Sequence, residues 1–143
     1  MKKILVPVDF SKSSERALDL ALAVAEKFGS TLDILHVWEP PRFSGGEASP
    51  QVNGRPMGDY AVEQAARDMD KLVSRIPADK RASVNVHVEV GRAWERIIDH
   101  AKGYDLIVMG THGHTGRVLS MAGSVAEAIV RLSPTPVLTV REP

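Results

Sequence analysis

Apolar residues follow two alternating patterns along this chain. Continuous apolar runs at 4–8 and 106–109 are typical of strands that are covered on both faces. Between such runs lie longer segments in which apolar residues recur every three or four positions, the spacing of one helical face. The alternation predicts five strands joined by four helices. The predicted strands are 4–8, 31–38, 84–90, 106–109 and 137–140, and the predicted helices begin after Ser11 and cover 62–76, 93–102 and 124–132.

Start and stop signals support these boundaries. Ser11 can accept a hydrogen bond at the start of the first helix, and Gly29 is placed to end it. The segment 39–58 is rich in proline, glycine and serine, so we predict a long loop there, of the kind that is often mobile or functional. Residues 84–90 alternate between valine and polar side chains, which favours a strand with one exposed side at the edge of a sheet.

Strands and helices that alternate in this way predict an α/β fold with a parallel, doubly wound sheet and helices on both faces. The two continuously apolar strands belong in the centre and the alternating strand at an edge, which favours the spatial order 3-2-1-4-5 in chain numbering. In that arrangement the order of the strands reverses between the first and fourth strands, and a crevice opens at their carboxyl ends. Asp9 and Gly110 follow these two strands, so we expect both at the crevice.

Composition agrees with a single folded domain over residues 1–143, because 43% of the residues are hydrophobic and 25% are charged. Lys and Arg number 18, as do Asp and Glu, so no overall basic field predicts nucleic acid as a partner. No apolar run reaches the roughly 18–20 residues of a membrane span, and the run after Met1 is too short for a signal peptide. Without cysteine there is neither a disulfide nor a thiol nucleophile. We expect a cytoplasmic protein that does not bind membranes.

A glycine pattern follows the fourth predicted strand and reads Gly110-x2-Gly113-x9-Gly123-Ser124. Glycines let the backbone approach a ligand closely, and successive N–H groups in such a loop can face an anion. The pattern ends where the fourth predicted helix begins, and a helix start adds free N–H groups and the positive end of its dipole. With the Ser124 hydroxyl, these groups predict a cradle for a nucleotide or another phosphorylated small molecule. Ordinary turn glycines are the alternative.

Over its whole length the sequence resembles the universal stress protein family, in its UspA-like, single-domain form. The matching segments are 4–11, 36–37, 105–113, 123–127 and 134–138. In that family the pattern Gly-x2-Gly-x9-Gly-[Ser/Thr] marks the members that bind ATP. The resemblance therefore implies the ATP-binding branch, a Rossmann-like fold of the adenine nucleotide alpha hydrolase type, and a Mg²⁺ ion that bridges the phosphates. The spacer 114–122 departs from the common pattern because its arginine, Arg117, lies early.

The resemblance also implies roles for individual residues. Pro7, Asp9 and Val37 would contact the adenine and ribose, Val37 through its backbone. The residues that would line the ribose and phosphate side are Met109, Gly110, Thr111, His112 and Gly113, with Arg117 as the cation of the loop. The residues that would hold phosphates at the start of the last helix are Gly123, Ser124 and Val125.

Other interpretations of single residues stay open from the sequence. Asp9 can also belong to the start of the first helix instead of contacting a ligand. His112 and His114 have no carboxylate or thiol nearby to complete a ligand set, so we predict no metal centre. The remaining histidines are interpreted as structural or surface residues; they are His36, His87 and His100.

The last predicted strand is short and apolar, and it lies at the other edge of the sheet. An exposed edge invites pairing with another chain. The resemblance implies a homodimer built through this strand, with Val137, Leu138 and Val140 in the interface. An edge protected by the neighbouring prolines and by Arg141 is the alternative.

Three functions follow from these observations. The first is a nucleotide-dependent stress-response or signalling module that binds ATP and acts as a homodimer. The second is a weak ATPase or phosphotransfer enzyme. The P-loop pattern is absent and no lysine lies in the cradle, so we assign no catalytic residue and expect slow hydrolysis at most. The third is a dimerisation module without nucleotide, against which the glycine spacing argues.

Overall fold

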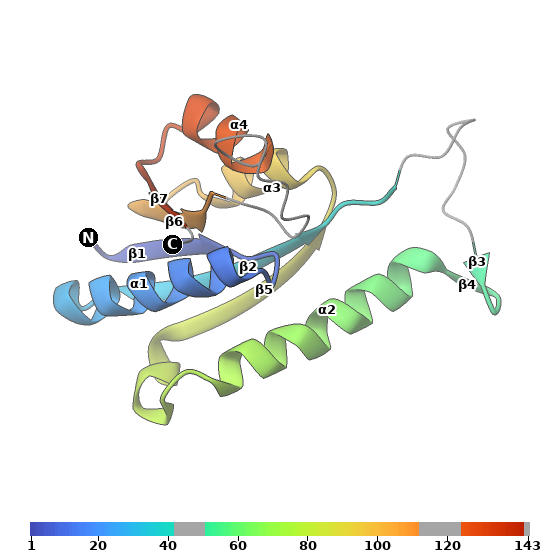
Figure 1. Ribbon diagram of the computed structural model, residues 1–143, viewed down its shortest axis with the longest axis horizontal. Helices are drawn as coiled ribbons and strands as arrows, with labels where there is room; N and C mark the ends of the chain where they lie inside the picture. The colour runs from blue at the N-terminus through green and yellow to red at the C-terminus, as the bar shows by residue number, and fades with distance from the viewer. Residues whose placement is uncertain (42–50, 112–123, 142–143) are drawn as a thin grey trace.

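The central element is a five-stranded parallel sheet, seen in the computed structural model (Figure 1). The structure describes residues 1–41, 51–111 and 124–141. The strands are β1 (Lys3–Pro7), β2 (Thr31–Trp38), β5 (Val84–Val90), β6 (Leu106–Gly110) and β7 (Val137–Val140). They lie in the order β5-β2-β1-β6-β7 and all pair in parallel. Since these are the five predicted strands, the predicted order 3-2-1-4-5 is confirmed.

Two pairs of helices cover the two faces of the sheet. The helices are α1 (Lys12–Phe28), α2 (Met57–Ser74), α3 (Ala93–His100) and α4 (Ser124–Leu132). Figure 1 shows α1 and α2 on one side of the sheet and α3 and α4 on the other. The core divides accordingly, with one apolar cluster under α1 and α2 and a second under α3 and α4. The fold is therefore the predicted doubly wound α/β arrangement.

The central strand β1 shows why its sequence is continuously apolar. Ile4 and Val6 pack into the cluster under α1 and α2, whereas Leu5 packs into the cluster under α3 and α4. All three side chains are fully buried. Successive residues of a strand point to opposite faces, so a strand between two helical layers needs an apolar residue at every position.

The ends of α1 follow the local signals in the sequence. Ser11 accepts a hydrogen bond from the backbone N–H of Ser14 at 3.2 Å, which satisfies one of the free donors of the first turn. Gly29 ends the helix in the left-handed conformation, with φ at 65°, and donates its N–H to the carbonyl of Ala25. Both predicted boundaries of this helix are confirmed.

The predicted loop at 39–58 is wrong in its second half. A small antiparallel hairpin forms from β3 (Gln51–Val52) and β4 (Arg55–Pro56), and α2 begins directly after it. Its turn residues, Asn53 and Gly54, both have positive φ, at 51° and 78°, as a two-residue hairpin turn requires. The Asn-Gly pair was the available signal. Residues 42–50 of the predicted loop lie outside the described part of the chain.

Three helical boundaries differ from the prediction, and one further short helix was not predicted. The second helix begins at Met57 rather than 62 and ends at Ser74 rather than 76, and its first turn lies close to β2, since a Cβ at Gly58 would lie 3.1 Å from Trp38 Cζ3. A 3-10 helix, η1 (Ala78–Ser83), precedes β5 and was not predicted. Helix α3 ends at His100, after which the chain turns toward β6. In the described ranges, no helix is both long and apolar enough to cross a bilayer.

One exposed carboxylate ties the start of β1 to the start of β6. Asp105 Oδ2 accepts hydrogen bonds from the backbone N–H groups of Lys2, at 2.7 Å, and Lys3, at 3.0 Å. These two donors lower the pKa of Asp105, the Lys3 amide most strongly. The carboxylate therefore stabilises the folded state when the pH lies above its ordinary pKa of 3.8, and this contribution is lost as the pH falls through the lowered value.

We expect Asp105→Asn to lower the free energy of unfolding at pH 7, because a neutral amide accepts hydrogen bonds less strongly than a carboxylate. The difference from the wild type should narrow as the pH falls below the ordinary carboxyl pKa, where the wild-type side chain also becomes neutral. Urea unfolding at a series of pH values measures it. Asp79→Asn, in η1, is the control and should show no such narrowing. A stability difference that stays constant between pH 7 and acid would contradict the role of the charge.

Candidate functional site

The site lies where the two central strands separate. The ladder between β1 and β6 ends at the pair Leu5↔Ile107, whereas β1 stays paired with β2 as far as Pro7↔Leu35. The backbone N–H of Val8 points to β2 and bonds Leu35, so by the alternation of a strand the nitrogen of Pro7 faces β6. Proline has no N–H to continue a ladder there. The chain therefore opens at the predicted reversal of strand order.

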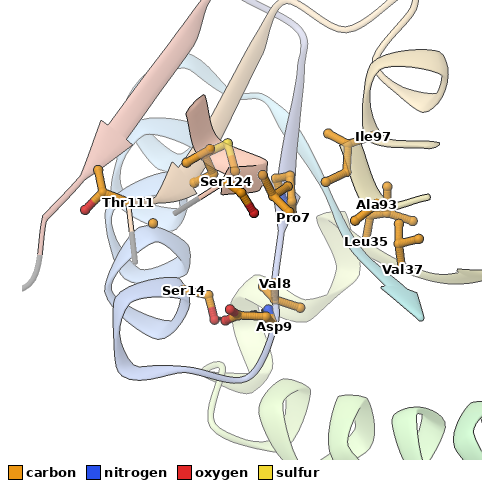
Figure 2. A pocket seen from close by; sticks show the side chains of 14 residues that line it. Pro7, Val8, Asp9, Ser14, Leu35, Val37, Ala93, Ile97, Thr111 and Ser124 are labelled. Atoms are coloured by element: carbon orange, nitrogen blue, oxygen red, sulfur yellow. Dashed lines mark hydrogen bonds between the residues drawn. The ribbon is translucent and has the colours of Figure 1, made fainter. Parts of the chain in front are cut away.

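A pocket of about 200 Å³ occupies this opening. Its described walls come from the ends of β1, β2 and β6 and from the first turns of α1, α3 and α4. The lining residues are Pro7, Val8, Asp9, Ser14, Leu35, Val37, Ala93, Ile97, Met109, Gly110, Thr111, Ser124, Val125 and Ala126 (Figure 2). Three helices thus begin at one pocket, and each helix start carries N–H groups without an acceptor inside the helix and a partial positive charge, although Ser11 and Glu39 already accept from Ser14 and Ala93. That arrangement favours an anionic ligand.

The pocket is apolar at one end and polar at the other. Figure 2 shows Leu35, Val37, Ala93 and Ile97 together on the side of β2 and α3. Thr111, just after β6, lies on the opposite side, Ser124 at the start of α4 lies between it and the apolar group, beside Pro7, and Asp9 and Ser14 lie together below them. Such a layout suits a ligand with a flat apolar part and a charged part.

Charge within the described lining is sparse. Asp9 is its one ionisable side chain, and no lysine or arginine belongs to it. A bound anion would therefore meet backbone N–H groups, hydroxyls and helix dipoles in this part of the pocket rather than a cationic side chain.

The turn between β1 and α1 places Asp9. Its Oδ1 accepts a hydrogen bond from the backbone N–H of Ser11 at 3.0 Å, so Asp9 belongs to the start of the helix as well as to the pocket wall. Phe10 adopts a left-handed backbone, with φ at 64°, and its ring packs on His36 at a centroid separation of 4.7 Å. A non-glycine residue in this conformation costs roughly 1–2 kcal/mol. The surrounding contacts therefore hold the turn in a conformation that it does not prefer.

Gly110 permits α1 to approach the sheet beside the pocket. A Cβ on Gly110 would lie 2.2 Å from Ser13 Oγ and 2.8 Å from the Ser13 backbone carbonyl carbon. The Ser13 hydroxyl in turn donates to the carbonyl of Val140 at 3.4 Å. Close approach of the backbone was expected toward a ligand, and the structure shows close approach toward α1. The position requires glycine for packing whether or not a ligand is bound.

The structure brings together all the predicted site residues that it describes. They are Pro7, Asp9, Val37, Met109, Gly110, Thr111, Ser124 and Val125, and all line the one pocket. The other four predicted residues, His112, Gly113, Arg117 and Gly123, lie outside the described ranges. The sequence analysis missed six lining residues: Val8, Ser14, Leu35, Ala93, Ile97 and Ala126. Ala93 and Ile97 had a usable signal, because a helix that follows a parallel strand begins at the carboxyl edge of the sheet, where the crevice lies.

The structure defines a doubly wound α/β protein with a pocket at the reversal point of its sheet, the place where ligands bind in open α/β sheets. Comparison with known proteins gives the family. The model of the universal stress protein family matches residues 1–141. The chain belongs to the universal stress protein family.

Individual relatives agree over nearly the whole length. The chain is 35% identical over 142 residues to "Universal stress protein A homolog 1" of Coxiella burnetii, covering 97% of this chain and 95% of that protein. It is 28% identical over 153 residues to universal stress protein MJ0577 of Methanocaldococcus jannaschii, covering 98% and 94% of the two chains. The solved structure of MJ0577 superposes with a TM-score of 0.81 at 29% identity, over 99% of this chain and 96% of that one.

Solved structures with bound nucleotides share the fold. The universal stress protein from Archaeoglobus fulgidus in complex with dAMP superposes with a TM-score of 0.69 at 23% identity, covering 98% of each chain. A universal stress protein in complex with cAMP superposes with a TM-score of 0.62 at 22% identity, over 98% of this chain and 96% of that one. At these identities the likeness establishes the fold alone.

We expect Gly110→Ala to lower the free energy of unfolding by about 1–3 kcal/mol, the usual cost of forcing extra volume into a packed site. Chemical denaturation measures the change. A double-mutant cycle with Ser13→Gly tests the cause, because that change removes the Ser13 Oγ and Cβ that the new methyl group would strike. The double variant should recover part of the loss. Strict additivity of the two changes would show that the clash is not responsible.

Proposed function

We propose that this protein binds ATP in the pocket between β1 and β6 and acts as a nucleotide-dependent stress-response or signalling module. The observation that carries the proposal is the start of α4, which opens on the pocket and follows the glycine pattern Gly110-x2-Gly113-x9-Gly123-Ser124 in the sequence. The N–H groups of that helix start, which have no acceptor within α4 itself, and the Ser124 hydroxyl suit phosphate oxygens. The dAMP and cAMP complexes of two structural neighbours support an adenine nucleotide as the ligand class.

The layout of the pocket assigns each part of the nucleotide a place in this proposal. The adenine ring lies at the apolar end, against Val37, Ala93 and Ile97. The Asp9 carboxylate accepts hydrogen bonds from the ribose hydroxyls, a role that an acidic side chain also has in dinucleotide-binding sheets. The phosphates lie toward Thr111 and Ser124. His112, Gly113, Arg117 and Gly123 complete the phosphate side in this proposal.

A Mg²⁺ ion fits the proposed complex only if phosphate oxygens supply most of its ligands. Magnesium prefers oxygen ligands and keeps several waters, so one protein carboxylate is sufficient when phosphates supply the remaining oxygens. Asp9 is the one carboxylate in the described lining. The chain therefore contributes little to a magnesium site on its own, and metal and nucleotide would bind together.

The proposed functional unit is a homodimer formed through β7. This strand ends the sheet opposite β5, and among the described residues no further strand pairs with its outer edge, whose backbone groups can pair with another chain. Leu138 on this strand is 38% exposed, and Val130 and Leu132 on the adjacent α4 are 56% and 55% exposed. A second copy paired along this edge would cover both the backbone groups and these apolar side chains. A cytoplasmic location goes with this proposal.

Nucleotide binding is measured by the melting temperature of nucleotide-free protein with ATP–Mg²⁺, ATP alone, AMP and GTP. At a ligand concentration 100 times its Kd we expect a gain of about 2.7 kcal/mol, or roughly 5–10 °C for a chain of this size. The adenine nucleotides should act and GTP should not. Gly113→Val should abolish the shift, because a side chain there would fill the proposed cradle.

Asp9→Asn separates the ribose contact from folding. Asparagine keeps an oxygen for the Ser11 amide, so the turn should survive, but the charged acceptor is gone. We expect the affinity for ATP to fall by roughly 10–100-fold, the usual value of a hydrogen bond to a charged group. Asp19→Asn, the same change at an exposed position of α1, should leave the affinity unchanged. If no nucleotide raises the melting temperature of the wild-type protein, the proposal that it binds ATP is refuted.

The dimer is tested by the mass in solution, from light scattering after size exclusion. The wild type should have twice the 15.6 kDa of one chain. Leu138→Arg should be monomeric, because it places a charge in the apolar edge. Leu20→Arg is a matched control, since Leu20 is 39% exposed, nearly the same as Leu138, but lies on α1. Monomeric wild type, or a Leu138→Arg dimer, would exclude β7 as the interface.

A further inference from the structure

A second group of polar side chains lies away from the pocket, on the face of the sheet that α3 covers. Asp33 on β2, His87 on β5 and His100 on α3 each offer one ligand atom, and these atoms lie within 4.8 Å of one another. None of the three residues lines the pocket. They are far apart in the sequence, and only the pairing of β2 with β5 and the packing of α3 bring them together (Figure 1).

Asp33 is a carboxylate held in place by two donors, with an imidazole nitrogen within reach of the same group. Asn85 Nδ2 donates to its Oδ1 at 3.0 Å, the Tyr104 hydroxyl donates to its Oδ2, and His87 Nε2 lies 3.3 Å from the same oxygen. The residue is only 6% exposed. Burial raises the pKa of Asp33, but these hydrogen bonds outweigh burial, and the pKa is lowered. The side chain is therefore a preoriented anion at neutral pH.

His100 is oriented in the way that metal-binding histidines usually are. Its Nδ1 lies 2.8 Å from Glu89 Oε2, and a carboxylate in that position fixes the ring and its tautomer and leaves Nε2 with the lone pair. The His100 ring lies against the His87 ring, with centroids 4.7 Å apart. Arg96 Nε lies 4.0 Å from the other oxygen of Glu89 and offsets its charge. Lys3 Nζ lies over the Tyr104 ring, 4.4 Å from its centroid.

We propose that Asp33, His87 and His100 bind one Zn²⁺ ion, with water as the fourth ligand. Two imidazoles and one carboxylate match the ligands that zinc takes in open tetrahedral sites, whereas magnesium and calcium prefer all-oxygen sites. Tetrahedral zinc bonds of ordinary length place neighbouring ligand atoms about 3.3 Å apart. The oxygen of Asp33 and the nitrogen of His87 already have that separation, at 3.3 Å. The ligand atom of His100 lies within 4.8 Å of the other two, so in this proposal a small shift of its ring, with the Glu89 contact kept, completes the site.

Solvent can reach this group of residues from one side. The His87 side chain is 36% exposed, that of His100 is 19% exposed and that of Asp33 is 9% exposed. An ion can therefore enter past His87 while Asp33 forms the floor. Glu89, Asn85 and Tyr104 then act as positioning residues, because they contact the ligands and not the ion.

The ion would join three elements that local sequence does not connect. It would bind β2, the edge strand β5 and α3 at one point, and α3 also supplies Ala93 and Ile97 to the pocket. The zinc site stands independently of nucleotide binding, since it shares no residue with the pocket lining. Its test needs no nucleotide, so either proposal can fail without the other.

The test uses the full chain, stripped of metal, and isothermal titration with Zn²⁺. We expect one ion per chain, a higher melting temperature with Zn²⁺, no response to Mg²⁺, and, with Co²⁺ in place of zinc, the visible absorption of a tetrahedral site. His87→Gln is the main variant, because this partly exposed side chain can change without disturbing the core. It should weaken Zn²⁺ binding by more than roughly 100-fold, since losing a ligand costs more than losing a positioning residue.

Two further variants locate the ion. Glu89→Gln should weaken zinc binding by about 10–100-fold, as changes to the partner of a metal-binding histidine do. His36→Gln is the matched control, because the His36 imidazole contacts the Val8 carbonyl and the Phe10 ring instead of the proposed site, so zinc binding should be unchanged. Metal-free melting curves show which variants fold. The proposal is overturned by a wild type that binds no Zn²⁺, by unchanged affinity in His87→Gln, or by loss of zinc binding in a folded His36→Gln variant.

Discussion

The separation of β1 from β6 beyond Leu5 is the constraint on which the arrangement of the molecule depends. Helices cover both faces of these two strands. The space that opens between the strand ends is therefore enclosed by the surrounding elements and forms a pocket. The helix that follows β1, α1, lies on one face of the sheet, and the helix that follows β6, α4, lies on the other. Both begin beside this opening. The pocket is therefore a consequence of the winding of the sheet, and its polar character comes from backbone at helix starts more than from charged side chains.

The turn after β1 and the glycine after β6 complete that rim by different means. Phe10 has an unfavourable backbone conformation, and the turn that it forms places Asp9 both at the helix start and in the pocket wall. Gly110 has no side chain, which leaves room for Ser13. In both cases the local sequence preference yields to a demand of packing, and both lie at the pocket. Such conflicts between local and global preferences are usual at functional sites.

Much of the fold could be predicted because its signals are local. Continuous apolar runs, Ser11 and Gly29 each depend on near neighbours in the chain, and the strand order followed from which strands were apolar on both faces. The hairpin at Asn53-Gly54 carried a local signal that the proline and glycine content of its surroundings obscured. The early start of α2 lies against Trp38, which is distant in the sequence, and the apolar periodicity did not indicate it. Within the site, the residues at the strand ends could be predicted from the sequence. The residues that α3 adds to the pocket wall could not, because they depend on where the start of that helix packs. The group formed by Asp33, His87 and His100 is wholly a product of tertiary packing.

The strict alternation along β5 has a further consequence, for how the chain finds its pairing. Val84 and Val88 pack toward the layer of α1 and α2, while His87 and Glu89 face the layer of α3. Displacement of this strand by one residue against β2 would exchange the two faces, putting valines among the polar partners of Asp33 and charges against an apolar core. Seven residue pairs join β5 to β2, so the penalty would be repeated along the whole strand. The alternation along this edge strand therefore specifies its register against β2, because any one-residue shift loses the match on both faces at once.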